Sequence, residues 1–165
     1  MWSSDACLRW LAVALLLLAG GCGFQFRGAP QLPPEMAVIH VEAADRYSPF
    51  YRELVSVLRR SNVRVTDDLA AARTVVKVLT DDTGRRLLSV TARNVPAEYE
   101  VYYRLRFLVT VDGIEAVPVE QLALTRDFAF DENQVLGKSG EEDAIRQAIA
   151  GDLVGLVMRR LSAVR

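Results

Sequence analysis

The chain has 165 residues, a formal net charge of −1, 51% hydrophobic residues and 25% charged residues. This composition is typical of a globular protein with enough chain to bury a core, and it excludes a disordered chain. The balanced charge also excludes a global basic field of the kind that attracts nucleic acid.

A short apolar run at the N-terminus precedes the first candidate site residue. Residues 11–19 form this run. It is too short to span a bilayer, which takes about twenty residues, but it has the length of the apolar region of a signal peptide. The small residues Ala19, Gly20 and Gly21 then lead to Cys22. We expect residues 1–21 to be a signal peptide that is removed, and Cys22 to be the acylated first residue of the mature chain.

This leader departs from the usual pattern of bacterial lipoproteins in two places. Leucine is usual three residues before the cysteine, where this chain has Ala19, and Asp5 offsets Arg9 in a weakly basic start. A plain signal peptide, or a short anchor helix with an incidental cysteine, is therefore the alternative. Gly23 follows Cys22, where aspartate would favour the inner membrane, so we expect an outer-membrane lipoprotein held by its acyl chains.

The predicted elements follow in chain order. Glycine and proline in residues 22–35 indicate an irregular tether. Hydrophobic periodicity predicts strands at 36–41, 74–80, 85–93, 99–111 and 119–130. It also predicts one helix from residue 48 to near residues 61–62 and another from 141 to near the C-terminus. Turns are expected at 81–84, 94–97 and 112–113, a turn or short helical piece at 67–73, and a polar loop at 131–140.

The clearest signals are one strand and the starts of two helices. Residues 99–111 are apolar at every second position, which predicts a long strand with one buried face. Ser48 followed by Pro49 is typical of a helix start, with serine as the cap. Three acids at 141–143 indicate the start of the last helix, because the helix dipole favours negative charge there. Strands that pair as hairpins beside two helices predict an α+β two-layer sandwich in one domain, residues 36–165.

Catalytic and metal-binding patterns are missing from the sequence. The only histidine, His40, lies within a predicted strand and is expected to be structural. Gly137, Lys138 and Ser139 resemble part of a phosphate-binding loop, but Glu132 stands where that loop needs glycine. The pairs at 67–68 and 81–82 look like solvated turn aspartates. We therefore expect no enzyme activity, no metal and no cofactor.

Binding remains as the functional class. Six basic residues fall on the predicted strands or the loop after them, and several could gather at one end of the sheet: Arg85, Arg86, Arg93, Arg104, Arg106 and Lys138. Arginines beside exposed apolar groups would suit an amphiphile that carries phosphates. The alternative is a set of solvated strand residues that discourage edge aggregation.

The sequence also resembles the LptE family of lipopolysaccharide-assembly lipoproteins. The resemblance is carried by short motifs in the family's order: residues 21–28 around Cys22, 32–34, 97–99, 126–131, 135–138, 141–142 and 160–161. Together these motifs cover essentially the whole mature chain. Each motif is degenerate, so the resemblance depends on their order and spacing.

The resemblance implies a fold, a partner and a ligand. The fold would be a four-stranded, mostly antiparallel sheet with two helices packed on one face. The partner would be an LptD-like outer-membrane β-barrel, inside which the protein forms a plug, aids barrel assembly and takes part in inserting lipopolysaccharide at the outer leaflet. By the same resemblance, Arg93 and Lys138 would contact lipopolysaccharide. The alternative is a structural outer-membrane lipoprotein of another envelope machine that does not bind lipopolysaccharide.

Overall fold

The computed structural model describes residues 32–130 and 135–164, and within the second range it describes residues 135–139 as helix without their side chains. The predicted signal peptide, Cys22 and most of the predicted tether lie outside these residues. No helix in the described part of the chain is long and apolar enough to cross a membrane.

The described elements run along the chain in the following order. They are the 3-10 turn η1 (Pro34–Met36), β1 (Val38–Glu42), α2 (Pro49–Arg60), β2 (Arg64–Thr66), the 3-10 turn η2 (Leu69–Ala71), β3 (Thr74–Val90), β4 (Pro96–Val111), β5 (Ile114–Ala129) and α3 (Val135–Ala163).

The sheet has five strands in the order β2-β1-β3-β4-β5, so the expected four-stranded, mostly antiparallel sheet is wrong in strand number and in direction. β1 runs parallel to both of its neighbours, whereas β3, β4 and β5 form an antiparallel meander. The helix α2 connects β1 to β2, and such a crossover returns the chain in a parallel direction. β2 was missed because its three residues are too few to show a period.

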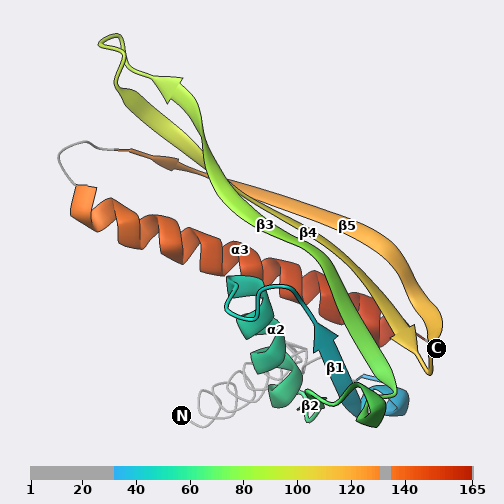
Figure 1. Ribbon diagram of the computed structural model, residues 1–165. Helices are drawn as coiled ribbons and strands as arrows, with labels where there is room; N and C mark the ends of the chain where they lie inside the picture. The colour runs from blue at the N-terminus through green and yellow to red at the C-terminus, as the bar shows by residue number, and fades with distance from the viewer. Residues whose placement is uncertain (1–31, 131–134, 165) are drawn as a thin grey trace, which may run out of the picture.

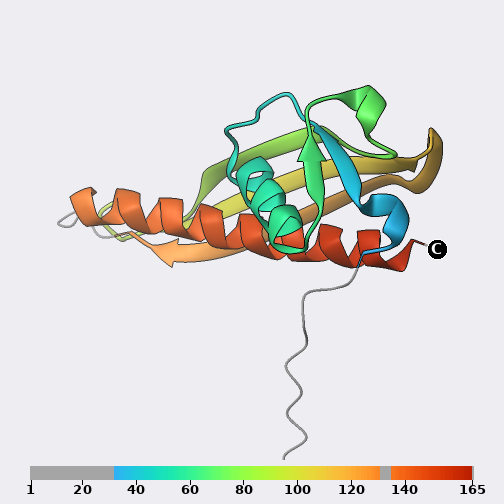
Figure 2. The same cartoon turned by 90° about the horizontal axis from the view of Figure 1, so that it is seen from below.

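Both helices cover the same face of the sheet, so the two-layer α+β arrangement is confirmed (Figures 1 and 2). The alternating apolar residues of β4 point into this layer and are fully buried: Val101, Tyr103, Leu105, Phe107 and Val109. Apolar residues of α2 and α3 complete the core from the other side: Phe50, Leu54 and Leu58, and Ile149, Leu153, Val157 and Leu161. The helix-covered face is called the inner face below, and the opposite one the outer face.

β3 is continuous through the residues predicted to form a turn at 81–84. It has 17 residues, with an irregular register between Val78 and Thr80. Asp82 lies on the outer face and pairs with Arg104, Nη2 to Oδ2, at 2.5 Å. At Gly84 an added Cβ would lie 2.5 Å from the Tyr102 hydroxyl, so the missing side chain makes room for this ring. The residues that were predicted to form a turn therefore lie within β3 and contact the neighbouring strand.

Asp81 joins the start of α2 to the sheet, which corrects its expected role as a solvated turn residue. Its Oδ1 accepts a hydrogen bond from the Tyr103 hydroxyl at 2.6 Å, and its Oδ2 accepts one from Ser48 Oγ at 2.5 Å. Ser48 Oγ in turn accepts from Tyr51 N at 3.1 Å, which confirms Ser48 as the predicted helix cap. Burial, followed by the bond to Asp81, raises the pKa of Tyr103.

Three boundaries differ from the sequence prediction. The β3–β4 turn occupies residues 91–95, so Arg93 lies in the turn rather than at the end of a strand. β5 begins at Ile114, directly after the correctly predicted turn at 112–113. α3 begins at Val135 and not at residue 141, so Lys138 lies in the helix and the three acids lie within it. The glycines and polar residues near 137–140 led the sequence prediction to place a loop there.

Candidate functional site

The β3–β4 hairpin extends far beyond β1 and β2, and the start of α3 lies at the same end of the molecule (Figure 1). β1 pairs with β3 only along Thr74–Lys77, so the rest of β3 continues past it. The hairpin end is defined here as residues 85–100 of β3, its turn and β4, together with residues 126–130 of β5. It is the candidate functional site.

The turn at the tip of the hairpin presents Arg93 to solvent. Thr91 N donates to the Val95 carbonyl at 2.8 Å, and Asn94 N donates to the Thr91 carbonyl at 2.9 Å. Asn94 has a φ of 60°, a left-handed conformation that asparagine tolerates better than most residues. Arg93 is exposed and forms no ion pair within the part of the chain that the structure describes. Its guanidinium group is therefore available to a ligand.

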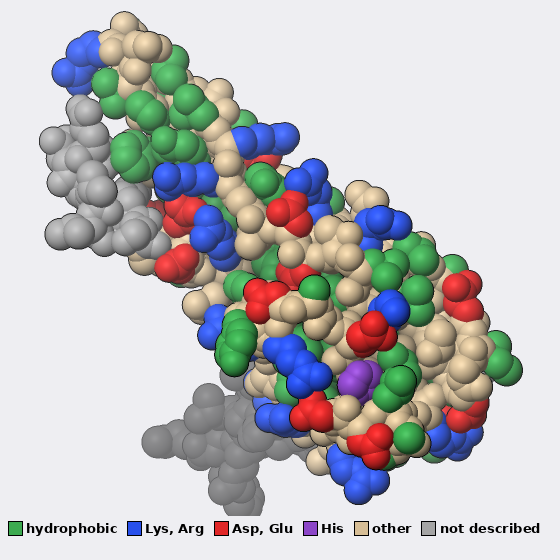
Figure 3. Space-filling model, viewed as in Figure 1, with side chains coloured by type: hydrophobic (Ala, Val, Ile, Leu, Met, Phe, Trp, Pro, Cys, Tyr) green, Lys and Arg blue, Asp and Glu red, His purple; other side chains and the backbone are tan. Residues whose placement is uncertain are grey.

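Exposed apolar side chains lie beside this turn. Leu87 is 48% exposed, Leu88 45% and Val90 47%. Figure 3 shows hydrophobic side chains gathered over this projecting part of the molecule, with a basic side chain at its far end. The hairpin end is therefore amphiphilic, with a cation next to apolar surface.

An aromatic cluster supports the inner face of the hairpin end. Tyr99 stacks on Phe128 with ring centroids 5.8 Å apart and meets Phe130 edge-on at 5.5 Å. The Arg85 guanidinium carbon lies 4.9 Å from the centroid of the Tyr99 ring. Such cation–π and aromatic contacts stabilise one arrangement of β3, β4 and β5 at the hairpin end, which extends beyond the main hydrophobic core.

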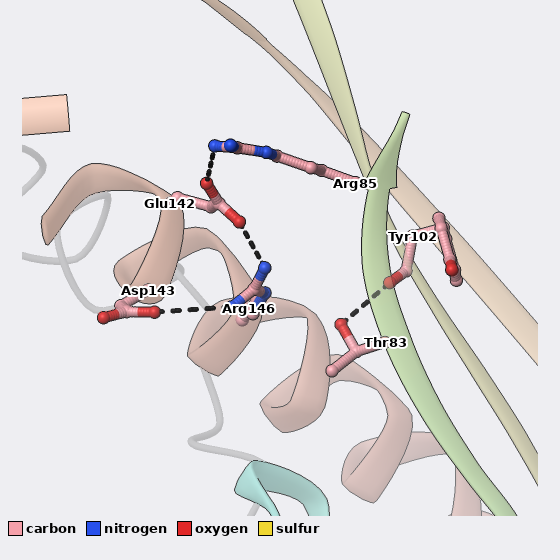
Figure 4. A network of polar contacts seen from close by, with 6 residues as sticks. All are labelled: Thr83, Arg85, Tyr102, Glu142, Asp143 and Arg146. Atoms are coloured by element: carbon pink, nitrogen blue, oxygen red, sulfur yellow. Dashed lines mark hydrogen bonds and ion pairs between the residues drawn. The ribbon is translucent and has the colours of Figure 1, made fainter. Parts of the chain in front are cut away.

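A polar network connects this cluster to α3 (Figure 4). Arg85 Nη1 donates to Glu142 Oε2 at 2.7 Å, and Arg146 pairs with Oε1 of the same carboxylate. Arg146 also lies 3.6 Å from Asp143. Glu142 is only 8% exposed, so two guanidinium groups neutralise a carboxylate that is largely removed from water. The network fixes the early part of α3 against the hairpin.

The outer face carries the remaining strand arginines. Arg86 Nε lies 2.6 Å from Glu100 Oε1, and Arg104 is held by Asp82, whose hydrogen bond raises the pKa of Arg104. Arg104 also lies 4.9 Å from the centroid of the Tyr102 ring. These arginines are already paired within the protein, so they are less available to a ligand than Arg93.

The six predicted basic residues are therefore divided between different places. Arg85 lies on the inner face, Arg86, Arg104 and Arg106 lie on the outer face, and Arg93 lies at the tip. Lys138 lies on the early turns of α3, at the same end as Arg93, but its side chain is outside the described residues. Cys22 is outside them as well.

Leu87, Leu88 and Glu142 were not among the site residues predicted from the sequence. Two adjacent leucines interrupt the alternation of a strand, and this break was the available signal. Glu142 gave no comparable signal, because its role depends on a partner 57 positions away in the sequence.

His40 has the structural role that the sequence predicted. Its Nδ1 lies 2.9 Å from the Thr66 carbonyl, which ties β1 to β2. Within the described ranges, no group of three or more His, Cys, Asp or Glu side chains could hold a metal ion.

Comparison with known sequences gives a consistent assignment. Residues 36–161 match the family model described as LptE, lipopolysaccharide-assembly. The LPS-assembly lipoprotein LptE of Yersinia enterocolitica is 28% identical over 155 residues, which cover 93% of this chain and 74% of that protein. The LptE protein of Pectobacterium atrosepticum is also 28% identical, over 93% of this chain and 83% of that protein.

Solved structures support the same fold. A lipoprotein B from Nitrosomonas europaea superposes with a TM-score of 0.70 at 22% identity, covering 86% of this chain and 91% of that one. The rare lipoprotein B from Shewanella oneidensis superposes with a TM-score of 0.65 at 24% identity, covering 76% of this chain and 94% of that one. At these identities the likeness establishes the fold alone, and the family follows from the sequence match. The chain therefore belongs to the LptE lipopolysaccharide-assembly family, whose members are non-enzymatic lipoproteins.

Proposed function

We propose that this protein binds lipopolysaccharide through the hairpin end and takes part in its insertion at the outer leaflet, in complex with an LptD-like β-barrel. The observation that carries the binding proposal is Arg93, an exposed cation with no ion pair among the described residues. It lies beside the exposed side chains of Leu87, Leu88 and Val90. Lipopolysaccharide presents phosphates next to acyl chains, so one cation with adjacent apolar surface matches both parts of it. Lys138, on the early turns of α3 at the same end, would supply a second cation.

The proposal includes acylation at Cys22 and a plug within the barrel. The first described residue, Leu32, is ten positions after Cys22 (32 − 22 = 10), which allows a span of about 35 Å at full extension. An acylated Cys22 would therefore keep the domain close to the membrane and to a partner embedded in it. The outer face, with Tyr102 and ion-paired arginines, suits contact with a polar barrel wall.

A binding measurement with the purified mature protein tests the ligand. We expect Arg93→Asp/Lys138→Asp to lower its affinity for lipopolysaccharide by about tenfold or more, because each reversal removes a charge-assisted contact and adds repulsion. Arg64→Asp/Arg106→Asp is the matched control, since both residues are exposed, lie outside the hairpin end and form no ion pair among the described residues. Equal affinity of the two double variants would remove the hairpin end from the binding site.

A pull-down from outer membranes tests the partner. The tagged full chain should recover an outer-membrane β-barrel protein in about equal amount, identified by mass spectrometry. Recovery of the protein without any barrel would count against the complex.

The second candidate function is a structural outer-membrane lipoprotein that does not bind lipopolysaccharide. One observation favours it: Arg85, Arg86 and Arg104 are all ion-paired within the protein, which leaves few free cations near the hairpin. Recovery of a barrel, with no measurable binding of lipopolysaccharide by the wild-type chain, would support this second function.

A further inference from the structure

A cationic groove lies on α2, away from the hairpin end. It encloses about 330 Å³ between α2, β2 and the loop before α2. Its rim carries Arg46, Arg52 and Arg59, and its floor is formed by half-buried Tyr51, Val55 and Val65. β2 is the edge strand opposite β5, and β1 and β2 meet the sheet only at the end of β3 far from the hairpin. The groove is thus distinct from the candidate site described above.

The side chains that line the α2 groove carry a net positive charge. Asp67 is the only carboxylate among its lining residues, and it is paired with Arg46, Nη1 to Oδ1, at 2.7 Å. Three arginines and one aspartate leave a local charge of +2, in a chain whose formal net charge is −1. Arg52 and Arg59 form no ion pair among the described residues.

The spacing on α2 places the two unpaired arginines on one side of the groove. Arg52 and Arg59 are seven positions apart, which is about two helical turns and roughly 10 Å along the axis. Val55 lies between them on the same side. Two planar guanidinium groups above an apolar floor can hold a phosphate oxygen cluster while the floor contacts a less polar part of the same molecule.

We propose that the α2 groove binds the phosphate group of an anionic membrane-lipid headgroup. The ten-residue connection from Cys22 keeps the domain within about 35 Å of the bilayer surface, so the groove can reach headgroups; this step rests on the proposed acylation. An acidic peptide added to the edge of the sheet is the weaker alternative, because β2 has only three residues with which to pair. Headgroup contact at this groove fixes which side of the domain faces the membrane.

Vesicle flotation tests this site without using lipopolysaccharide. The probe protein is the full mature chain with Cys22→Ser, which cannot be acylated, so that all vesicle binding comes from the folded domain. We expect binding to vesicles of 30% phosphatidylglycerol in phosphatidylcholine, little binding to phosphatidylcholine alone, and loss of binding as salt rises. Because the readout is independent of lipopolysaccharide and of the barrel, failure here leaves the proposed function standing.

Matched variants locate the binding. Arg52→Gln should weaken vesicle binding about fivefold and Arg52→Gln/Arg59→Gln roughly twenty-fivefold, since each arginine near an anionic surface contributes about 1 kcal/mol. Arg106→Gln removes the same charge from an exposed residue of the outer face that has no ion pair among the described residues, and it should change binding by less than about twofold. Arg52→Lys/Arg59→Lys, which keeps the charge but loses the planar fork, should fall between the wild type and the double glutamine variant.

Three results would overturn the proposal. The first is equal binding to neutral and anionic vesicles. The second is an equal effect of Arg52→Gln and Arg106→Gln, which would show that vesicle binding depends on the net charge of the protein and not on the groove. The third is displacement of the vesicles by micromolar acidic peptide but not by millimolar glycerol phosphate, which would identify the groove as a protein-docking site.

Discussion

Tyr103 is the central residue in the contact between the start of α2 and the sheet. Its hydroxyl group donates to Asp81 and accepts a hydrogen bond from Phe50 N at 3.1 Å, within a fully buried environment. The sequence predicted its burial from the alternation of β4. It could not predict the bond to Asp81, because adjacent aspartates before a glycine are also the usual composition of a turn.

Replacing Tyr103 tests this contact. Tyr103→Phe leaves the Phe50 amide without its acceptor and removes one of the two donors to Asp81, so we expect a loss of about 1–3 kcal/mol in the free energy of unfolding. Urea denaturation measures this change. Tyr102→Phe is the control, since the same atom is removed from the neighbouring residue on the outer face, and its effect should stay within about 0.5 kcal/mol. Equal losses in both variants would contradict the proposed role of the Tyr103 hydroxyl.

A pH dependence is expected at Glu120, which connects β5 to α3. Its carboxylate accepts hydrogen bonds from Arg160 Nε and Nη2, which lower the pKa of Glu120. A carboxyl group with a lowered pKa in the folded state stabilises the fold above its unfolded pKa, and this contribution disappears as pH falls through the folded pKa. Wild type should therefore be more stable than Glu120→Gln at pH 7. The difference should begin to shrink as pH falls below the ordinary glutamate pKa of about 4.3, and it should vanish once pH is below the lowered pKa of Glu120 in the folded state.

Thermal unfolding of both proteins across this pH range measures the Glu120 effect. Glu115→Gln is the control on the same strand, because Glu115 is exposed and has no ion pair among the described residues. A difference between wild type and Glu120→Gln that does not change with pH would show that the ion pair is not its source.

At the scale of elements, α3 determines how the hairpin end is supported. The sequence predicted its amphipathic stripe but placed its start six residues too late, because Gly137 and Gly140 resemble loop residues. In the structure, the early part of α3 is held by Glu142, which pairs with Arg85 of β3 and with Arg146 of its own helix. This contact between distant segments could not be read from local spacing.

Glu142→Gln tests this support. Glutamine keeps the shape of the side chain but removes the charge that two guanidinium groups share, so the hydrogen bonds weaken. Arg85 loses its counter-ion, and Arg146 keeps only the longer contact with Asp143. We expect faster amide hydrogen exchange in the first turns of α3, corresponding to about 1–3 kcal/mol of local stability. Asp152→Asn, which removes an exposed ion pair with Arg126 farther along α3, should change exchange much less. Unchanged exchange in Glu142→Gln would contradict the supporting role.

The strands show where sequence reasoning succeeds and where it fails. β4 was predicted almost completely, because one of its faces is buried at every second position from Val101 to Val109. The break predicted in β3 and the missed β2 have one cause in common: neither segment has a regular alternation of buried and exposed residues. In the β1–α2–β2 unit, the helix between the two strands makes them parallel. The sequence did predict this helix, but the strands were assumed to pair as antiparallel hairpins, so the parallel direction was missed.

For the whole molecule, the two proposed binding sites lie at different ends of the sheet. The hairpin end carries a cation beside exposed apolar side chains, and the α2 groove carries two arginines at the other end of the sheet. None of these three cations has an ion pair within the part of the chain that the structure describes. The sequence predicted a ligand contact for Arg93 through the family resemblance, and it predicted the wider set of basic residues from their places on strands and the following loop. It could not show which arginines are free, because ion pairing depends on the register of β3 and β4.

The proposed function depends above all on a contact between lipopolysaccharide and the tip of the hairpin. Site-specific photo-crosslinking in intact outer membranes tests it most directly, with a photoreactive residue at position 93 and, as control, at position 64 on the exposed β2 edge. We predict a lipopolysaccharide adduct at position 93 that is several-fold more abundant than at position 64. Equal adducts at both positions, or none at position 93 while the protein remains folded and associated with its barrel, would contradict the claim.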